Sequence, residues 1–319
     1  MSFAARLVAW QRRHGRHDLP WQGTRDPYRI WLSEVMLQQT QVSAVIPYYT
    51  RFLDRFSNVK KLAEASQDEV LRLWSGLGYY ARGRNLHQAA KQIVSGFPKT
   101  AEEIEKLPGV GRSTAAAIAV FAFGARAAIL DGNAKRVLAR VFGVEDPDWD
   151  LAERELPKKD VASYTQALMD LGATLCTRSK PDCARCPVTR LCRARKEDRV
   201  HELPKPRPGK ILPLRHATWL VLRRQGSVLL ERRPSPGIWG GLWCFPERLE
   251  GVRGGRKLEP IEHGFTHFQL RIQPLLHDAP RRLPRNAQFE RRWMPIAEAA
   301  AAAVPTPVRA LLARLSGAS

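Results

Sequence analysis

Apolar residues recur at helical spacing along the first part of the chain. Phe3, Leu7 and Trp10 are separated by four and three positions, and the run 115–123 contains only Ala, Ile, Val and Phe. Spacing of this kind is typical of amphipathic or buried helices, and no strand-like alternation persists in this part of the sequence. The pattern therefore predicts an all-α domain over residues 1–192.

The pattern changes in the last third of the chain. Residues 217–222 and 227–231 are short apolar runs separated by Arg-Arg-Gln-Gly, which is typical of a β-hairpin. Residues 268–272 alternate between apolar and polar positions, and residues 296–316 are rich in Ala and Leu. Strands followed by a closing helix predict an α+β domain over residues 216–319.

A basic segment separates the two predicted domains. Residues 193–215 contain eight Lys or Arg, three acids and a Pro-Lys-Pro-Arg-Pro run at 204–208. A segment so rich in charge and proline has little apolar surface to bury. We therefore expect residues 193–215 to form an extended linker.

The charge balance points to a polyanionic partner. The 319 residues include 52 Lys or Arg and 31 Asp or Glu, which gives a formal net charge of +21, while 44% of the residues are hydrophobic. A chain of this composition can form a core and carry its basic excess on the surface, so nucleic acid is the first partner to consider.

The longest clean apolar run has nine residues, far fewer than the roughly 20 that span a bilayer. The N-terminus lacks an apolar signal core, so we expect an intracellular, cytoplasmic protein that associates with the nucleoid and not with membranes. Nothing in the sequence indicates symmetry, and a monomer is expected.

Four of the five cysteines lie within seventeen residues. Their spacing is C-x6-C-x2-C-x5-C, and the four residues are Cys176, Cys183, Cys186 and Cys192. Four closely spaced thiolates suit either tetrahedral zinc or a [4Fe–4S] cluster, and they favour a reducing compartment over a disulfide framework. Basic residues in the same loop suggest contact with phosphates, with Arg178, Lys180 and Arg185 as the candidates.

A glycine-containing turn separates two predicted helices. Leu107-Pro-Gly-Val-Gly111 follows a polar helix and precedes the apolar run 115–123. Gly109 and Gly111 allow a tight turn whose N–H groups point outward at a helix start, which favours an anion. This is the helix–hairpin–helix arrangement that holds a DNA backbone, although an ordinary turn between helices would also explain the pattern.

Two carboxylates lie in unusual surroundings. Glu34 is the only charged residue between Arg29 and Arg51, within an otherwise apolar helix. Burial there would raise its pKa and leave a general acid at neutral pH, although a structural glutamate held by neighbouring amides is the plainer interpretation. Asp131 precedes a predicted helix and is a natural N-cap, whose helix N–H groups favour the anion. One raised acid and one held anion is the combination that glycosidic bond cleavage uses.

Together, several motifs resemble those of the adenine DNA glycosylases, the MutY family within the helix–hairpin–helix glycosylases. The resemblance covers the whole chain and rests on the cysteine loop and four segments, Trp31–Gln41, Gly76–Arg82, Leu107–Thr114 and Leu130–Asn133. It implies a helical glycosylase core with a [4Fe–4S] loop, followed by a MutT-like, Nudix-related domain. The implied activity is removal of adenine mispaired with 8-oxoguanine or guanine in double-stranded DNA, by base flipping, as the first step of base excision repair.

The resemblance also implies roles for individual residues. Glu34 matches the residue that protonates N7 of adenine, and Asp131 the carboxylate that stabilises the oxocarbenium-like sugar. Further matches are Asn133 at the nucleophile site, Gln166 against adenine, Tyr79 as the wedge near 8-oxoguanine, and Gln38 close to the unpaired space. Phe265, Thr266 and His267 match the loop that recognises 8-oxoguanine, with Thr in place of the usual Ser.

Two departures define the expected reaction subtype. Lyase-competent relatives have a Lys where this chain has Ser113, so we expect a monofunctional enzyme that leaves an intact abasic site. After Gly241 the chain offers Glu247 and Glu250 without the Glu-rich helix of working Nudix hydrolases, so nucleotide hydrolysis is not expected. A pyrimidine-lesion glycosylase–lyase is disfavoured by Ser113 and the second domain. The alternative from a different class is a non-catalytic iron–sulfur DNA-binding or redox-sensing module, which explains the charge and the cysteines but not Glu34.

Overall fold

The computed structural model describes residues 1–205, 209, 211–252, 254–278 and 289–317. The chain divides into two compact units. The first unit comprises Met1–Ala63 and Gln88–Pro208, and the second comprises Glu64–His87 and Gly209–Ser319. The sequence predicts residues 64–87 as part of the helical domain, and they pack instead within the unit that holds the sheet.

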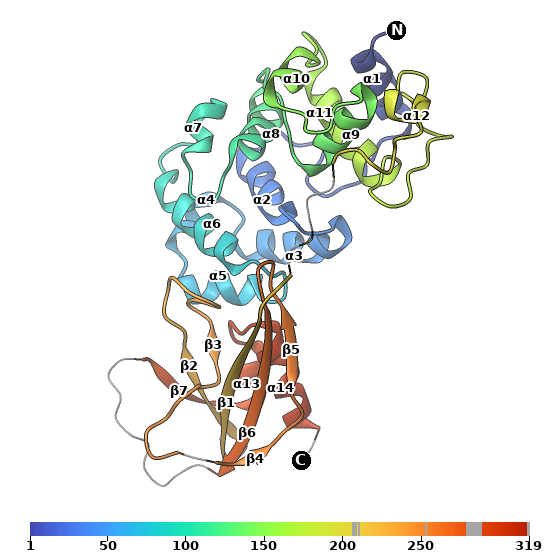
Figure 1. Cartoon of the computed structure of the whole chain (residues 1–319). Helices are drawn as coiled ribbons and strands as arrows, with labels where there is room; N and C mark the ends of the chain where they lie inside the picture. The colour runs from blue at the N-terminus through green and yellow to red at the C-terminus, as the bar shows by residue number, and fades with distance from the viewer. Residues whose placement is uncertain (206–208, 210, 253, 279–288, 318–319) are drawn as a thin grey trace. The chain divides into compact units, whose positions relative to one another are not determined.

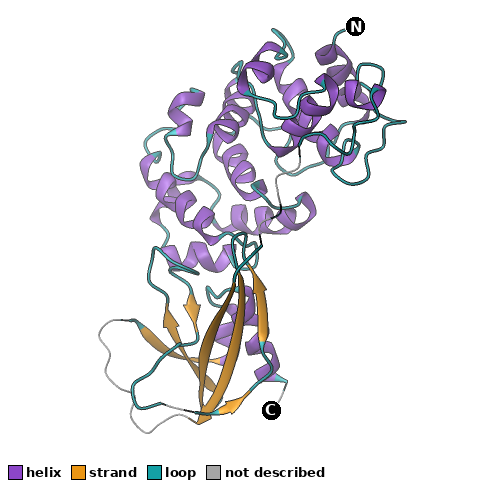
Figure 2. Cartoon of the chain, viewed as in Figure 1, coloured by secondary structure: helices purple, strands orange, loops and turns teal. Residues whose placement is uncertain are grey.

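The described part of the first unit is helical and contains no strand (Figure 2). This confirms the all-α prediction for the described residues of this unit. Its helices, labelled in Figure 1, are α1 (Phe3–His14), α2 (Pro27–Leu37), α3 (Val42–Arg55), α4 (Val59–Glu64), α7 (Ala101–Glu105), α8 (Arg112–Phe123), α9 (Gly132–Phe142), α10 (Trp149–Arg154), α11 (Val161–Thr174) and α12 (Arg193–Lys196).

Local sequence signals set the ends of the helices that carry the candidate residues. The side chain of Asp26 caps α2, whose first residue is Pro27. Asp131 caps α9, and Gly143 ends that helix in the left-handed conformation that glycine adopts without strain. Helices α1, α9 and α11 share one core, in which the side chains of Leu7, Leu138 and Leu171 are among those fully buried.

The second unit combines one mixed β-sheet with helices. Strands β3, β2, β1, β6 and β4 follow one another across the described sheet, while β7 pairs with β2 and β5 pairs with β6. Strands β1 and β6 are parallel over ten residue pairs, and the other pairings are antiparallel. The elements are α5 (Gln67–Trp74), α6 (Tyr80–Gln92), β1 (Leu214–Arg224), β2 (Ser227–Arg232), β3 (Trp243–Cys244), β4 (Arg256–Lys257), β5 (Ile261–Gly264), β6 (Gln269–Asp278), β7 (Arg291–Pro295), α13 (Ile296–Ala301) and α14 (Thr306–Ser316).

The predicted α+β character of this unit is confirmed, with one correction. The sequence predicts a single helix over residues 296–316, and the structure contains α13 and α14 with a break between them. Pro305 has an extended conformation and is followed by the first residue of α14. Because a proline cannot continue a preceding helix, α13 ends before it.

Hydrogen bonds fix the segment 64–87 within the second unit. The Ser75 hydroxyl donates to the Val304 carbonyl, and Arg309 donates to the Ser75 hydroxyl oxygen at 2.8 Å. Arg84 donates to the carbonyl of Gly240 at 2.8 Å. These contacts explain why α5 and the start of α6 belong to this unit despite their position in the sequence.

The predicted extended linker is wrong for residues 193–205. This segment contains the short helix α12, and it buries Ala194 completely and Leu203 to all but 2%. Arg140 of α9 donates to the Leu203 carbonyl at 3.0 Å. The segment therefore packs against α9 although its average composition is strongly polar. The rest of the Pro-Lys-Pro-Arg-Pro run, 206–208, lies outside the described residues.

No helix in the described part of the chain is both long and apolar enough to cross a bilayer.

Candidate functional site

Glu34 occupies the position expected of a general acid. It lies on α2 between the buried residues Ser33 and Val35, and it lines a cavity of about 540 Å³. Burial, and to a smaller extent the negative charge of Asp131, raise the pKa of Glu34 to about 8. The side chain is therefore protonated near neutral pH and faces a space that a ligand can enter.

Asp131 is held by the first turn of α9. One carboxylate oxygen, Oδ1, accepts hydrogen bonds from the N–H groups of Asn133 at 2.8 Å and Ala134 at 2.7 Å. The predicted N-cap is thus confirmed. The expectation that the cap favours the anion is not met in the net direction: burial is the largest effect and raises the pKa of Asp131 above its usual value, although the two N–H groups and Arg136 lower it. Asp131 is not among the residues that line the cavity, and its effect on Glu34 is electrostatic.

Gln166 reaches the same cavity from helix α11. Its side-chain Nε2 donates to Oδ1 of Asp170 at 2.9 Å. Asp170 is fully buried and forms an ion pair with Arg16, which also lines the cavity. Sequence reasoning missed Asp170 and Arg16. The sequence does show Asp170 as one acid inside the apolar stretch Ala-Leu-Met-Asp-Leu of α11. It does not indicate the partner, because Arg16 lies 154 residues away in the chain.

Asn133 contributes to the contact between α9 and α11. A Cβ added at Gly172 would lie 2.6 Å from the Asn133 Cβ, so only glycine allows this approach of the two helices. The amide oxygen of Asn133 accepts from Arg136 at 2.8 Å, and Arg136 also donates to the carbonyls of Gly172 at 2.6 Å and Cys176 at 2.7 Å. Arg136, which sequence reasoning missed, thus ties the cap of α9 to α11 and to the start of the cysteine loop.

The glycine-containing turn lies between α7 and α8, as the hairpin prediction requires. Gly109 has φ of 78°, a left-handed conformation that favours glycine, and Gly111 caps α8. The Gln38 amide donates to the Gly109 carbonyl at 3.2 Å and to the Thr114 hydroxyl at 3.3 Å, so Gln38 braces the turn. The Ser113 hydroxyl accepts from the N–H of Leu130 at 3.0 Å and anchors the residue before Asp131.

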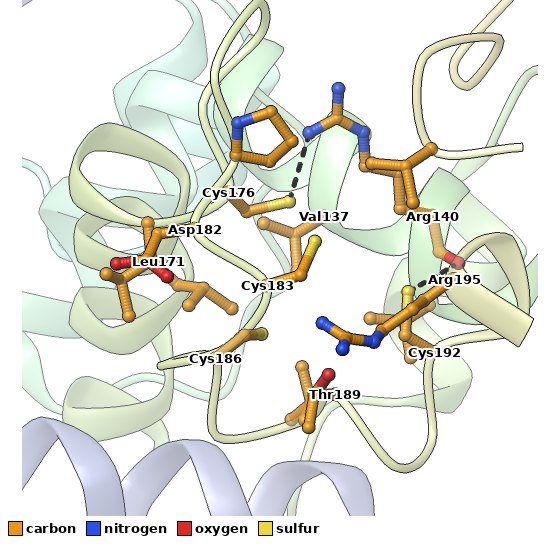
Figure 3. Close-up of a pocket in the computed structure, with 15 residues that line it drawn as sticks. Val137, Arg140, Leu171, Cys176, Asp182, Cys183, Cys186, Thr189, Cys192 and Arg195 are labelled. Carbon is orange, nitrogen blue, oxygen red and sulfur yellow. Dashed lines mark hydrogen bonds between the residues drawn. The ribbon is translucent and has the colours of Figure 1, made fainter. Parts of the chain in front are cut away.

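The four cysteines of the loop line one pocket beside α9 and α11. Figure 3 shows the side chains of Cys176, Cys183, Cys186 and Cys192 converging on this pocket. All five cysteines of the chain are free thiols, and Cys244 lies in the other unit. Among the described residues, no group of three or more His, Cys, Asp or Glu is placed to hold a single metal ion. Four thiols that line one pocket fit the all-cysteine ligand set of an iron–sulfur cluster.

Arg140 organises the cysteine loop from within. It is 2% exposed and donates to Cys176 Sγ at 3.4 Å and to the carbonyls of Thr177 at 2.7 Å and Arg178 at 3.1 Å. The Cys192 thiol donates to the backbone carbonyl of Arg140 at 3.2 Å. Sequence reasoning missed this residue, because a single Arg in a basic helix carries no distinguishing signal. The side chains of the predicted phosphate contacts Arg178, Lys180 and Arg185 are exposed.

Tyr79 lies in the second unit on a tightly turned segment. Its φ is 47°, which is uncommon for a bulky residue, and 46% of its surface is exposed. The buried Arg82 guanidinium lies 5.1 Å from the Tyr79 ring centre and contacts the Gly78 carbonyl at 3.4 Å. An exposed aromatic ring on a braced turn is suited to insertion between bases.

The predicted lesion-recognition loop connects β5 to β6 in the second unit. Phe265 stacks on Phe268 with ring centres 4.4 Å apart and also packs near Trp239 at 5.5 Å. Thr266 and His267 are exposed, and the Thr266 hydroxyl lies 3.2 Å from His267 Nδ1. Aromatic packing therefore anchors the loop and leaves its polar groups free of the core.

Comparison with known proteins agrees with this arrangement. Residues 32–159 match the HhH-GPD superfamily of base excision DNA repair proteins, and residues 217–314 match the NUDIX domain. A structure of a thermostable thymine-DNA glycosylase superimposes with a TM-score of 0.57 at 29% identity, over 61% of this chain and 95% of that chain.

Two named relatives extend over both domains. The adenine DNA glycosylase of Homo sapiens is 34% identical over 361 residues, covering 85% of this chain and 66% of the human protein. The adenine DNA glycosylase of Buchnera aphidicola subsp. Baizongia pistaciae (strain Bp) is 38% identical over 298 residues, covering 86% of this chain and 85% of that protein. With this identity over most of its length, the chain belongs to the adenine DNA glycosylase family.

Proposed function

We propose that this glycosylase hydrolyses the N-glycosidic bond of adenine mispaired with 8-oxoguanine or guanine in double-stranded DNA. The observation that carries the proposal is Glu34, a carboxyl group with a pKa of about 8 at the wall of a cavity, electrostatically coupled to Asp131. A purine in the cavity would meet an acid that is still protonated at neutral pH. General acid–base catalysis of this kind contributes roughly 10²–10⁴-fold to a rate.

The two carboxyl groups have separate roles in this mechanism. Glu34 donates its proton to N7 of the flipped adenine, which makes the base a better leaving group. As the glycosidic bond breaks, positive charge develops on the sugar, and the carboxylate of Asp131 stabilises that charge. Water then adds to C1′ of the sugar and gives up a proton to the Glu34 carboxylate, which restores the acid. The products are free adenine and an intact abasic site, with Asn133 supporting the site of attack.

Ser113 fits a monofunctional reaction. A lyase needs an amine that forms a Schiff base with the sugar, and a hydroxyl cannot supply one. The Ser113 hydroxyl instead accepts from the Leu130 N–H. The basic candidate nearest in sequence to Asp131, Lys135, is ion-paired with Asp146.

Cys176, Cys183, Cys186 and Cys192 would hold a [4Fe–4S] cluster, the cofactor that the resemblance implies. When bound, the cluster would supply structural cross-linking of the loop. The chain's own contribution is to present the exposed Arg178, Lys180 and Arg185 to DNA phosphates, in addition to the Gly109–Gly111 hairpin.

Recognition of the opposite base is assigned to the second unit. Tyr79 would enter the base stack, and Phe265, Thr266 and His267 would contact 8-oxoguanine through the exposed polar groups of their loop. The Nudix-type domain is proposed to read the lesion without hydrolysing nucleotides. Glu247, one of the two acids available for a metal, is ion-paired with Arg233 at 2.9 Å. We propose that the protein acts as a monomer.

The test is single-turnover release of adenine from one duplex sequence with 8-oxoguanine, guanine or thymine opposite the adenine. Release opposite 8-oxoguanine and guanine, and none opposite thymine, is expected. Tight binding of every duplex without release, by protein that retains its cluster, would support the non-catalytic DNA-binding module instead.

A further inference from the structure

Asp170 is a buried carboxylate that the proposed chemistry does not use. It lies on α11, one helical turn after Gln166, and has no exposed surface. Its Oδ1 accepts from the Arg16 Nε at 2.7 Å, and its Oδ2 accepts from the Arg16 backbone N–H at 3.0 Å. The remaining partner of Oδ1 is Nε2 of Gln166 at 2.9 Å. A fully buried carboxylate that is paired so completely holds its neighbours in one arrangement.

This arrangement determines which end of the Gln166 amide faces the cavity. The oxygen and nitrogen of a glutamine amide have almost the same shape, so packing alone does not choose between them. An ionised carboxylate only accepts hydrogen bonds, and therefore Asp170 requires the NH₂ group of Gln166 on its side. The Gln166 carbonyl oxygen is then left to accept a hydrogen bond from a base in the cavity. Gln166 lines this cavity together with Glu34 and Arg16.

We infer that Asp170 is a positioning residue that makes Gln166 an acceptor and thereby selects a 6-aminopurine over a 6-oxopurine. The exocyclic amine of adenine donates a hydrogen bond, whereas O6 of hypoxanthine or guanine accepts one. An acceptor facing O6 would leave two buried acceptors unpaired, which disfavours the 6-oxopurine. The inference rests on the proposed function, since it concerns which base that cavity takes.

The test compares adenine with hypoxanthine, each placed opposite 8-oxoguanine in the same duplex. Hypoxanthine keeps N7, the atom that Glu34 would protonate, and differs from adenine on the edge that carries the exocyclic group. In Asp170→Asn an NH₂ group replaces one of the two carboxylate oxygens. In either orientation it faces a donor, the Arg16 backbone N–H at the place of Oδ2 or Arg16 Nε and Gln166 Nε2 at the place of Oδ1, so the arrangement that fixes the Gln166 amide is broken. We expect the ratio of the single-turnover rates, adenine over hypoxanthine, to fall by roughly tenfold or more. An unchanged ratio in folded protein would overturn the inference.

Asp160→Asn is the matched control. Asp160 is the N-cap residue that precedes α11, and it forms an exposed ion pair with Arg12. The substitution removes the same charge at the start of that helix, from a residue that does not line the cavity, so the rate ratio should stay at the native value.

A second variant keeps the inference testable if Asp170→Asn does not fold. Gln166→Leu leaves the Arg16–Asp170 pair in place and removes the acceptor, and it should lower the same ratio by a similar factor. Retention of the native ratio in Gln166→Leu would also overturn the inference.

Where both variants fold, adding Asp170→Asn to Gln166→Leu should change the ratio no further, because the positioned group is already gone. If the native protein releases no adenine from any duplex, it is the proposed function that fails, which separates the two outcomes.

Discussion

The negative charge of Asp131 raises the pKa of Glu34, in addition to the larger effect of burial. Two acids from different helices, 97 residues apart in sequence, are therefore coupled in titration. Such coupling favours the state in which one of the two groups is protonated.

The rate of base release should depend on the protonated form of Glu34. Since its pKa is about 8, the single-turnover rate should be level near neutral pH and fall about tenfold per pH unit well above pH 8. A pH profile measured with adenine opposite 8-oxoguanine checks this. A rate that stays constant to pH 9.5 or above would show that Glu34 is not the acid.

Glu34→Gln should abolish base release and stabilise the fold at high pH. The folded pKa of Glu34 is raised from 4.5 to about 8, so between these values the unfolded chain has lost a proton that the folded chain retains. Stability therefore falls as pH rises through this window, by at most about 1.4 kcal/mol per pH unit. The variant lacks this loss, so its advantage in free energy of unfolding should be larger at pH 8 than at pH 5. Chemical denaturation at the two pH values measures the difference; equal differences from native at both would contradict the assigned pKa.

Arg140→Lys should loosen the cysteine loop. A lysine cannot serve the carbonyls of Thr177, Arg178 and Leu203 together, and an unpaired buried acceptor costs about 1–3 kcal/mol. We expect a loss of unfolding free energy of at least about 2 kcal/mol, measured by denaturation of protein with its cluster intact. The same change at the exposed Arg190 is the control and should be nearly neutral. Equal effects at the two positions would refute the role assigned to Arg140.

The exposed basic residues of the cysteine loop should account for part of the salt dependence of DNA binding. Each phosphate contact that is lost should reduce the slope of log K against log salt by about 0.9. The triple replacement of Arg178, Lys180 and Arg185 by Ala is thus expected to lower the slope by up to about 2.7 while leaving the single-turnover rate at saturating enzyme unchanged. An unaltered slope would remove these residues from the DNA interface. Replacing Arg154 by Ala, an exposed residue of α10 paired with Glu155, is the control for each single replacement in the loop, because it removes one positive charge outside the loop.

Features encoded by neighbouring residues were predictable from the sequence. Asp131 as an N-cap, the turn at Gly109 and the strands around residues 217–231 each depend on residues within a few positions, and the structure contains all three. Glu34 could be singled out because it is one charge in an apolar helix. The four cysteines could be grouped because their ligand spacing is short.

Only the tertiary structure decided how distant residues are paired. The Arg16–Asp170 pair that orients Gln166, the Arg140 contacts within the cysteine loop and the packing of residues 64–87 with the sheet have no local signature. The folding of residues 193–205 was missed because the average polarity of a segment conceals the two side chains that it buries, Ala194 and Leu203. Local sequence patterns reflect only the conformational preferences of a few neighbouring residues. A buried polar group needs a hydrogen-bond partner, and the packing of whole helices determines which distant residue lies close enough to be that partner.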